Sequence, residues 1–194
     1  MKSIAITGTI GSGKSIVMSL LSKDYPTIDC DVIAHKLLEE NQAGYNAVLH
    51  AFHELFSNQP FSHKLLADHV FNNNKALRKL EAILHPMVLN EVQRLLHLYQ
   101  DKTYVFVEVP LLFEVSWQEY FDLSVVVYTK KENIYRRLSV NRNMTKDDVD
   151  KRLKRQFSSL KKRRLADYVI DNNDSLEVLT TNINEFIKWL KHTA

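Results

Sequence analysis

A glycine-rich segment near the start of the chain has the spacing of a phosphate-binding loop. It reads Gly8-Thr9-Ile10-Gly11-Ser12-Gly13-Lys14-Ser15, a full match to the pattern G-x-x-x-x-G-K-[ST]. Glycine tolerates positive φ and lets the backbone come close to an anion, so successive N–H groups can point at a phosphate in front of the following helix. Three of the four glycines of the chain lie in this segment. The segment therefore predicts a binding site for a nucleoside triphosphate.

The side chains at the end of this loop suit phosphates and a metal ion. Lys14 is expected to reach the β- and γ-phosphates of the nucleotide, and the Ser15 hydroxyl is expected to bind Mg²⁺. The other residues expected to contact the nucleotide here are Gly11, Ser12, Gly13 and Ile16. In isolation the segment could be only a flexible turn. The apolar residues before it and the helical pattern after it favour the phosphate site.

Carboxylates follow two other predicted strands. Asp29 and Asp31 flank Cys30 directly after the short strand Thr27–Asp29. In the functional interpretation, one of them holds metal-bound water and the other orients an acceptor hydroxyl. In the structural alternative, Asp31 is the N-cap of a helix 32–40 and the other carboxylate is only solvated. Glu108, near the end of the next strand, suits either the shell of the metal or a structural network.

Two further features have both a functional and a structural interpretation. His85 precedes Pro86 between two predicted helices, where its ring could bind a phosphate or only a backbone group. Lys and Arg residues are concentrated between Arg136 and Arg164. That segment could be a solvated helix face, a nucleic-acid surface or a mobile flap whose arginines stabilise the transferring phosphoryl group. The flap is favoured, because the phosphate loop is present and the segment has few aromatic residues for base stacking.

Composition sets the broad class of the protein. Of the 194 residues, 45% are hydrophobic and 25% are charged, which is ordinary for a globular chain long enough for one substantial core. The net charge of +3 does not separate nucleic-acid partners from small anions. A single cysteine excludes an internal disulfide and a four-cysteine zinc site. With no signal region and no apolar run of about 20 residues, we expect a cytoplasmic protein with no membrane span.

Buried strands alternate with helices along most of the chain. The residue pattern predicts a doubly wound α/β protein, with a five-stranded parallel sheet in a three-layer α/β/α fold of the P-loop NTPase type. The predicted strands are 3–7, 27–29, 104–109, 123–129 and 168–170. The predicted helices are 14–23, with Ile16, Val17, Leu20 and Leu21 on its inner side, then 32–40, 45–56, 64–71, 75–84, 87–99, 132–140 and 175–190. Ligands are then expected at the carboxyl ends of the strands.

The long helical stretch from residue 44 to residue 98 exceeds an ordinary connection between strands. We therefore expect a single α/β domain with helical excursions. Its core comprises residues 1–40, 103–135 and 166–194, and the helical excursions cover residues 41–102 and 136–165.

Several segments together resemble one family, the dephospho-CoA kinases. The matching segments are GTIGSGKS (8–15), DCDVIAHKL (29–37), LLADHVF (65–71), LEAILHPMV (80–88), VPLLFE (109–114) and ADYVIDNN (166–173). They cover nearly the whole chain in the order of the family. The phosphate loop is generic, but its combination with the Asp-x-Asp, His-Pro and Val-Pro-Leu-Leu-Phe-Glu segments is specific.

The resemblance implies an activity and a set of roles. The core would bind the nucleotide, residues 41–102 would form a helical CoA-binding region, and residues 136–165 would form an arginine-rich lid of a single kinase domain. ATP and Mg²⁺ would phosphorylate the ribose 3′-hydroxyl of dephospho-CoA, giving CoA and ADP. Asp31 would face the 3′-hydroxyl with Asp29 nearby, Asn172 would lie beside the adenine, and His85 and Leu111 would border the acceptor. Arg137 is the expected catalytic arginine, with Arg136 and Arg142 as alternatives. The other matches to the lid pattern are Arg152, Gln156, Lys162, Ala166 and Asp167.

The chain departs from the family pattern at four positions. Thr9 replaces a frequent glycine, which is harmless if its φ is negative, and Cys30 replaces a usual alanine. His63 stands where arginine is common, which puts a basic contact of the helical region in doubt. Asn141 stands where an arginine often follows Arg137, so the identity of the arginine that reaches the nucleotide is left open.

The sequence therefore predicts an ATP- and Mg²⁺-dependent kinase acting on dephospho-CoA as a monomer, with no nucleic-acid or membrane partner. The nearest alternative is a nucleoside or nucleotide kinase of the same architecture. A GTP-dependent switch protein is disfavoured because Asn-Lys-x-Asp and Asp-x-x-Gly motifs are missing. A nucleic-acid-binding protein would rest on the basic segment alone.

Overall fold

The chain forms two compact units. The computed structural model describes residues 1–71 and 73–193. The first unit comprises Met1–Ile28 and Tyr99–Ala194, and the second comprises Asp29–Leu98. The phosphate loop and the basic segment therefore belong to the first unit.

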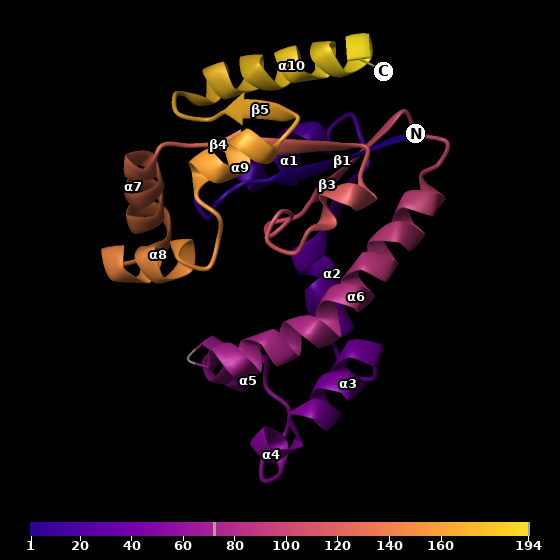
Figure 1. Cartoon of the computed structure of the whole chain (residues 1–194), viewed down its shortest axis with the longest axis vertical. Coiled ribbons are helices and arrows are strands. Elements are labelled where there is room, and N and C mark those ends of the chain that lie inside the picture. Colours follow the sequence, from indigo (N-terminus) through magenta and orange to yellow (C-terminus); the bar gives the residue numbers. More distant parts are fainter. Residues whose placement is uncertain (72, 194) are drawn as a thin grey trace. The chain divides into compact units, whose positions relative to one another are not determined.

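A five-stranded sheet forms the centre of the first unit (Figure 1). Its strands are β1 (Lys2–Thr7), β2 (Thr27–Asp29), β3 (Tyr104–Glu108), β4 (Leu123–Tyr128) and β5 (Tyr168–Asp171), in the order β2-β3-β1-β4-β5. Strand β1 pairs in parallel with β3 and β4, and β4 pairs in parallel with β5. The predicted α/β fold with a five-stranded parallel sheet is confirmed.

The order of the strands brings distant segments of the chain together. Strand β1 lies between β3 and β4, with Ile6 opposite Glu108 on one side and Val125 on the other. Because the carboxyl ends of parallel strands meet at one edge of a sheet, the segments after β1, β4 and β5 become neighbours there. These segments begin with the phosphate loop, Thr129 and Asn172.

Two helices cover the apolar core of this sheet. Helix α10 (Leu176–Thr193) lies alongside β5 (Figure 1) and buries Leu179, Ile183, Phe186 and Leu190, which recur at the period of a helix. Helix α1 (Lys14–Leu21) buries Val17, Met18 and Leu21 in the same core. Ile16 was expected on this inner side, but its side chain is 49% exposed. The buried stripe passes through positions 14, 17, 18 and 21, so Ile16 falls on another face of the helix.

The second unit consists of helices around their own apolar cluster. After α2 (Cys30–Leu37) come α3 (Ala43–Ala51), α4 (His53–Phe56), α5 (His63–Phe71) and α6 (Asn74–Leu98). The predicted helix 45–56 is divided at Phe52, where the backbone leaves helical geometry. Phe52, at the break, and Phe56, after it, are both buried in the apolar cluster.

The prediction of a helix break at Pro86 was also wrong. Pro86 was expected to separate two helices, but α6 runs through it, as the uninterrupted ribbon in Figure 1 shows. A proline inside a helix removes one hydrogen bond and crowds the preceding turn. Here the buried residues Leu84, Val88, Val92 and Leu96 form one stripe at intervals of four on both sides of the proline. Continuous burial of this stripe outweighs the local cost of the proline.

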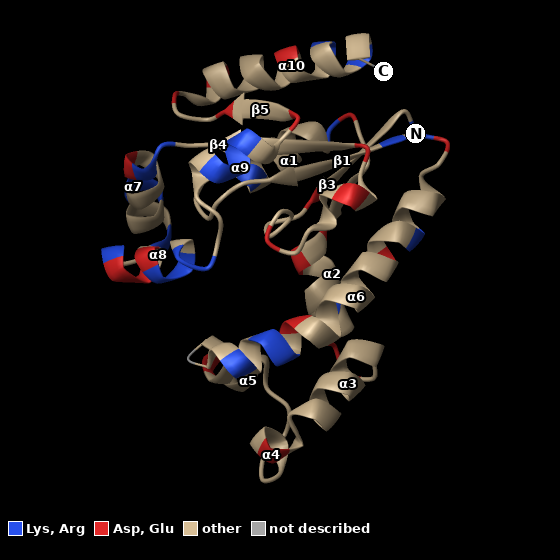
Figure 2. Ribbon diagram, viewed as in Figure 1, with Lys and Arg blue, Asp and Glu red and all other residues tan. Residues whose placement is uncertain are grey.

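Three helices carry most of the basic segment of the first unit. They are α7 (Lys131–Arg142), α8 (Lys146–Leu153) and α9 (Ser159–Leu165). Figure 2 shows basic residues on all three helices, interspersed with acidic residues on α7 and α8. Ile134, Leu138 and Val149 form a small buried cluster between α7 and α8, with Ile10 of the phosphate loop packed against it. The basic segment is therefore anchored to the loop by apolar contacts.

The remaining elements of the first unit are short. A turn of 3-10 helix, η1 (Trp117–Tyr120), lies between β3 and β4. In the part of the chain that the structure describes, none of the helices combines the length and the apolar character that a membrane span requires.

Candidate active site

The phosphate loop joins β1 to α1 and uses two of its glycines in left-handed conformations. The φ angle is 74° at Gly11 and 94° at Gly13, a region that other residues adopt only at a cost. A Cβ atom on Gly13 would lie 2.1 Å from Nδ2 of Asn172, and a Cβ atom on Gly11 would lie 3.0 Å from Cγ of Leu138. Both positions therefore require glycine. Thr9 is not among the described residues with positive φ, so the threonine is accommodated there.

The amino end of α1 is arranged to receive an anion. Gly13 is the N-cap residue and makes no side-chain capping hydrogen bond, and the first turn contains no acidic residue. Aligned peptide dipoles place partial positive charge at such a helix end. The Lys14 ammonium donates to the carbonyl oxygens of Gly8 and Thr9, at 3.1 and 3.3 Å, and so lies along the same loop. The backbone shape and the local charge fit the phosphates of ATP.

The carbonyl oxygen of Ser12 accepts hydrogen bonds from three donors. Asn172 Nδ2 donates to it at 2.7 Å, the Thr129 hydroxyl at 3.0 Å, and Arg137 Nη1 at 3.5 Å. Arg137 Nη2 also donates to the carbonyl oxygen of Asn172 at 2.9 Å. These donors come from the segments after β4 and β5 and from α7. Together they fix the orientation of the peptide that precedes Gly13.

Arg137 and Asn172 thus lie directly against the loop. Asn172 is only 4% exposed, and its amide is engaged by Ser12. Arg137 Nη1 lies 3.8 Å from the position that a Cβ atom on Gly13 would take. Burial lowers the pKa of the Arg137 guanidinium, and the neighbouring charge of Arg136 adds to this effect. The guanidinium keeps its charge at neutral pH because its pKa starts far above this range.

Ser15 is the residue whose hydroxyl suits a metal ion. It lies in the first turn of α1 and is exposed. Among residues 1–71 and 73–193, no three His, Cys, Asp or Glu side chains gather as a protein-only metal site would require. Mg²⁺ in kinase sites is usually held by one or two protein oxygens together with substrate phosphates. A single hydroxyl beside the phosphate loop fits that kind of site.

The N-cap of α2 is Asp29 and not Asp31, which the sequence suggested. The carboxylate of Asp29 accepts from the backbone N–H groups of Asp31 and Val32, at 2.8 and 3.1 Å, and is the N-cap of α2. The prediction that Asp31 caps this helix was wrong. A cap must precede the first helical residue, and α2 begins earlier than expected, at Cys30. Asp31 therefore lies in the first turn of α2 with its side chain exposed.

The other residues of the predicted acceptor site lie in both units. His85 is half-buried on α6, a helix that packs against α2 within the second unit. Burial lowers the pKa of His85, and the charge of Glu81 opposes this effect. Leu111 follows β3 in the first unit and is partly exposed, and Glu108 is buried at the end of that strand.

A buried network beside the loop was not singled out from the sequence. Lys162 is 0% exposed, and its ammonium lies 3.0 Å from a carboxylate oxygen of Glu114. Gln156 Oε1 accepts from the N–H of Ile10, inside the phosphate loop, at 2.9 Å. Lys162 and Gln156 were known only as matches to the lid pattern. Nothing in the charge pattern distinguishes Lys162 from the exposed basic residues around it.

The chain is similar to dephospho-CoA kinases over nearly its whole length. The family model described as "Dephospho-CoA kinase" matches residues 2–177. A dephospho-CoA kinase of Bdellovibrio bacteriovorus is 33% identical, with 98% of this chain and 97% of the relative covered. A solved structure from Thermus thermophilus is 32% identical with a TM-score of 0.84, covering 97% of both chains. The structure of dephospho-CoA kinase from Campylobacter jejuni is 27% identical with a TM-score of 0.71, covering 99% of this chain and 98% of that chain.

The lowered pKa of His85 predicts a pH-dependent contribution to stability. The folded chain binds a proton at His85 less readily than the unfolded chain, whose histidine pKa is about 6.5. This contribution is therefore fully present above the unfolded value and is lost as the pH falls through the folded value. The urea midpoint of the wild type should fall more steeply from pH 7.5 to pH 5 than that of His85→Gln.

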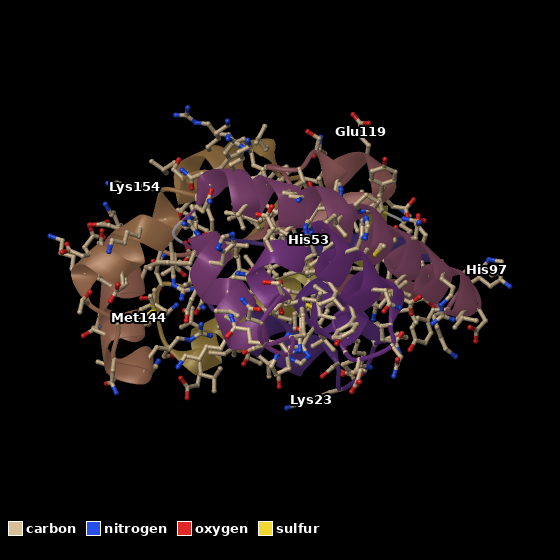
Figure 3. The ribbon with its side chains drawn as sticks, turned by 90° about the horizontal axis from the view of Figure 1, so that it is seen from below. Lys23, His53, His97, Glu119, Met144 and Lys154 are labelled. Carbon is tan, nitrogen blue, oxygen red and sulfur yellow. The ribbon has the colours of Figure 1, made fainter. Side chains whose placement is uncertain are left out.

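His97→Gln is the matched control, because His97 lies exposed at the end of the same helix (Figure 3). Its pH profile should follow that of the wild type. Superimposable profiles of the wild type and His85→Gln would show that His85 makes no such contribution.

Proposed function

The chain belongs to the dephospho-CoA kinase family, and we propose which of its residues perform each part of the transfer from ATP to the 3′-hydroxyl of dephospho-CoA. The observation that carries the proposal is the phosphate loop, with its glycine N-cap and the charges of Lys14 and Arg137 beside it. Phosphoryl transfer passes through a loose transition state, so catalysis depends mainly on positioning and on electrostatic stabilisation.

The loop and the start of α1 hold the triphosphate of ATP. The residues from Gly11 to Ile16 supply backbone N–H groups, and Lys14 supplies a charge for the β- and γ-phosphates. The hydroxyl of Ser15 is the protein ligand proposed for Mg²⁺, which neutralises charge on the phosphates when it is bound. Support comes from the left-handed glycines and from the helix end, whose cap is a glycine without a side chain.

Asp31 is the carboxylate proposed for the acceptor hydroxyl. It orients the 3′-hydroxyl and takes its proton late in the transfer. Asp29 is a positioning residue, because its carboxylate fixes the first turn of α2, on which Asp31 lies. His85 and Leu111 are proposed to border the acceptor. The low pKa of His85 favours a neutral ring, which can both donate and accept a hydrogen bond.

Arg137 is proposed to stabilise charge on the transferring phosphoryl group. Its contacts with Ser12 and Asn172 hold the guanidinium beside the amino end of α1. Asn172 is proposed to border the adenine while it supports the loop. Residues 136–165 are proposed to act as a lid, and closure of such a lid would exclude water from the reaction.

We also propose that the enzyme acts as a monomer in the cytosol. The loop, Thr129, Arg137 and Asn172 all come from one chain, so the nucleotide site needs no second copy. The chain has a single cysteine, which is buried and has no second cysteine in the chain with which to form a disulfide, and this suits a reducing compartment.

Substitution of Asp31 tests the acceptor site. Asp31→Asn keeps the shape of the side chain and removes its charge, so kcat with dephospho-CoA should fall by about 10²–10⁴ while ATP affinity stays unchanged. Asp29→Asn is the matched control; asparagine caps helices as well as aspartate, so its effect should be much smaller. Steady-state kinetics and ATP titration measure both. Full turnover in Asp31→Asn with a loss in Asp29→Asn would reverse the two assignments, and no effect in either would refute the proposed acceptor site.

Substitution of Arg137 tests the electrostatic role. Arg137→Ala should lower kcat by about 10³ or more, the magnitude typical of a transition-state arginine, with a smaller change in KM for ATP. Arg136→Ala is the comparison, because this neighbouring guanidinium binds the side chain of Asn133 instead of the loop. An unchanged kcat in Arg137→Ala would transfer the role to Arg136 or Arg142.

A further inference from the structure

A buried ion pair joins three separate segments of the first unit. The ammonium of Lys162, on α9, lies 3.0 and 3.1 Å from the two carboxylate oxygens of Glu114, which follows β3. The same ammonium donates to the carbonyl oxygen of Pro110 at 2.7 Å and to the hydroxyl of Thr7, the last residue of β1, at 3.4 Å. The pair thus connects α9 with the end of the strand from which the phosphate loop begins.

Glu114 has a second partner in the segment between α8 and α9. One of its carboxylate oxygens accepts from the backbone N–H of Phe157 at 2.7 Å, a short, charge-assisted bond. On either side of Phe157, Gln156 accepts from the N–H of Ile10 and the Ser159 hydroxyl lies 3.2 Å from that of Thr9. Residues 156–159, here called the return segment, are therefore tied both to Glu114 and to the phosphate loop.

Polar contacts hold the return segment beside a cavity. Its residues form part of the wall of a cavity of about 500 Å³, whose other sides come from α7, α8 and the end of β4. A segment beside open space lacks packing on that side, so its position depends on its polar contacts. Glu114 supplies the charged acceptor among the hydrogen bonds of residues 156–159 named above, and the ammonium of Lys161 lies 3.2 Å from the centroid of the Phe157 ring.

A contribution to stability is a poor explanation for this buried pair. The desolvation of two charges often cancels their attraction, and well-packed neutral residues of similar size are often as stable. Burial also lowers the pKa of Lys162, while the charge of Glu114 opposes this effect. What a neutral apolar pair cannot supply is an acceptor for the N–H of Phe157.

We propose that Glu114 and Lys162 are positioning residues that hold the return segment in the position needed for phosphoryl transfer. Through Gln156, the return segment in turn holds the N–H of Ile10. The proposal rests on the function proposed above, in which residues 136–165 form a lid. Lys162 places the carboxylate of Glu114, and Glu114 holds Phe157. The segment through which the lid joins the core is then fixed to the phosphate loop.

Two double variants separate this positioning role from a merely structural one. Glu114→Gln/Lys162→Met removes both charges but keeps a side-chain oxygen that can accept from Phe157. Glu114→Leu/Lys162→Met removes both charges and also the acceptor. Neither variant leaves an unpaired buried charge, so both should fold. The leucine variant should have the lower thermal midpoint, because the N–H of Phe157 loses its acceptor. The readouts are the thermal midpoint, amide hydrogen exchange of residues 143–160, and kcat and KM for ATP.

The variant without the acceptor should lose order and turnover together. In Glu114→Leu/Lys162→Met, exchange at residues 156–160 should accelerate and kcat should fall by about 10- to 100-fold, as expected for loss of a charge-assisted hydrogen bond. KM for ATP should change less, because the loop itself is intact. Glu114→Gln/Lys162→Met should keep kcat within about threefold of the wild type, since a neutral hydrogen bond recovers most of the restraint.

Asp122→Leu is the matched control. The Asp122 carboxylate also accepts a backbone N–H, that of Ser3 at 2.7 Å, but at the opposite end of β1. Its loss should lower the thermal midpoint and leave kcat and the exchange of residues 156–160 unchanged. If both double variants behave like this control, the pair is only structural and the proposal is refuted.

Two further outcomes keep the test decisive. If Glu114→Leu/Lys162→Met does not fold, Gln156→Leu removes only the acceptor for Ile10 and should still lower kcat; an unchanged kcat would refute the link to the loop. Hydrogen exchange does not depend on the chemical step. Full turnover in Asp31→Asn would refute the acceptor assignment. If exchange at residues 156–160 is nevertheless faster in Glu114→Leu/Lys162→Met, the positioning pair is supported independently of that assignment. Unchanged exchange in this double variant would refute the positioning role of the pair.

Discussion

The hydrogen bonds to the carbonyl oxygen of Ser12 are the interaction on which the rest of the nucleotide site depends. A loop with three glycines in six residues loses much conformational entropy on ordering, and its left-handed residues have no side chains to pack. Donors from Asn172, Thr129 and Arg137 restrain it through this carbonyl oxygen. The backbone N–H groups of the restrained loop can then be directed at phosphates. The parallel sheet makes this possible, because it brings the ends of β1, β4 and β5 together.

The two units contribute different kinds of chemistry to the proposed reaction. Phosphate binding is proposed for the first unit, mainly through backbone groups and fixed positive charge, which suits a transition state with diffuse negative charge. The proposed acceptor carboxylate, Asp31, belongs to the second unit and lies on a helix whose start is fixed by Asp29. In this proposal Asp29 acts through Asp31, so the two neighbouring carboxylates do not have equivalent roles.

The elements with a local signature could be predicted from the sequence. The phosphate loop, the buried strands and the parallel sheet follow from short-range patterns that leave few alternatives. The continuation of α6 through Pro86 could not be predicted in this way, because it depends on the burial of residues on both sides of the proline. The N-cap of α2 was assigned to Asp31 instead of Asp29 because this helix begins two residues before its predicted start. Lys162 resembles its basic neighbours in sequence, and only the fold shows that its side chain is buried against Glu114.

The account rests on a phosphate loop whose geometry allows only glycine at position 13. The most direct test is calorimetric titration of Gly13→Ala with ATP and Mg²⁺, without the acceptor. A Cβ atom there would meet the side chain of Asn172 at 2.1 Å in a backbone conformation with φ of 94°. Strain of at least one to two kcal/mol should weaken ATP binding by about tenfold or more while the circular dichroism spectrum stays unchanged. Wild-type affinity for ATP in a folded Gly13→Ala protein would contradict the account.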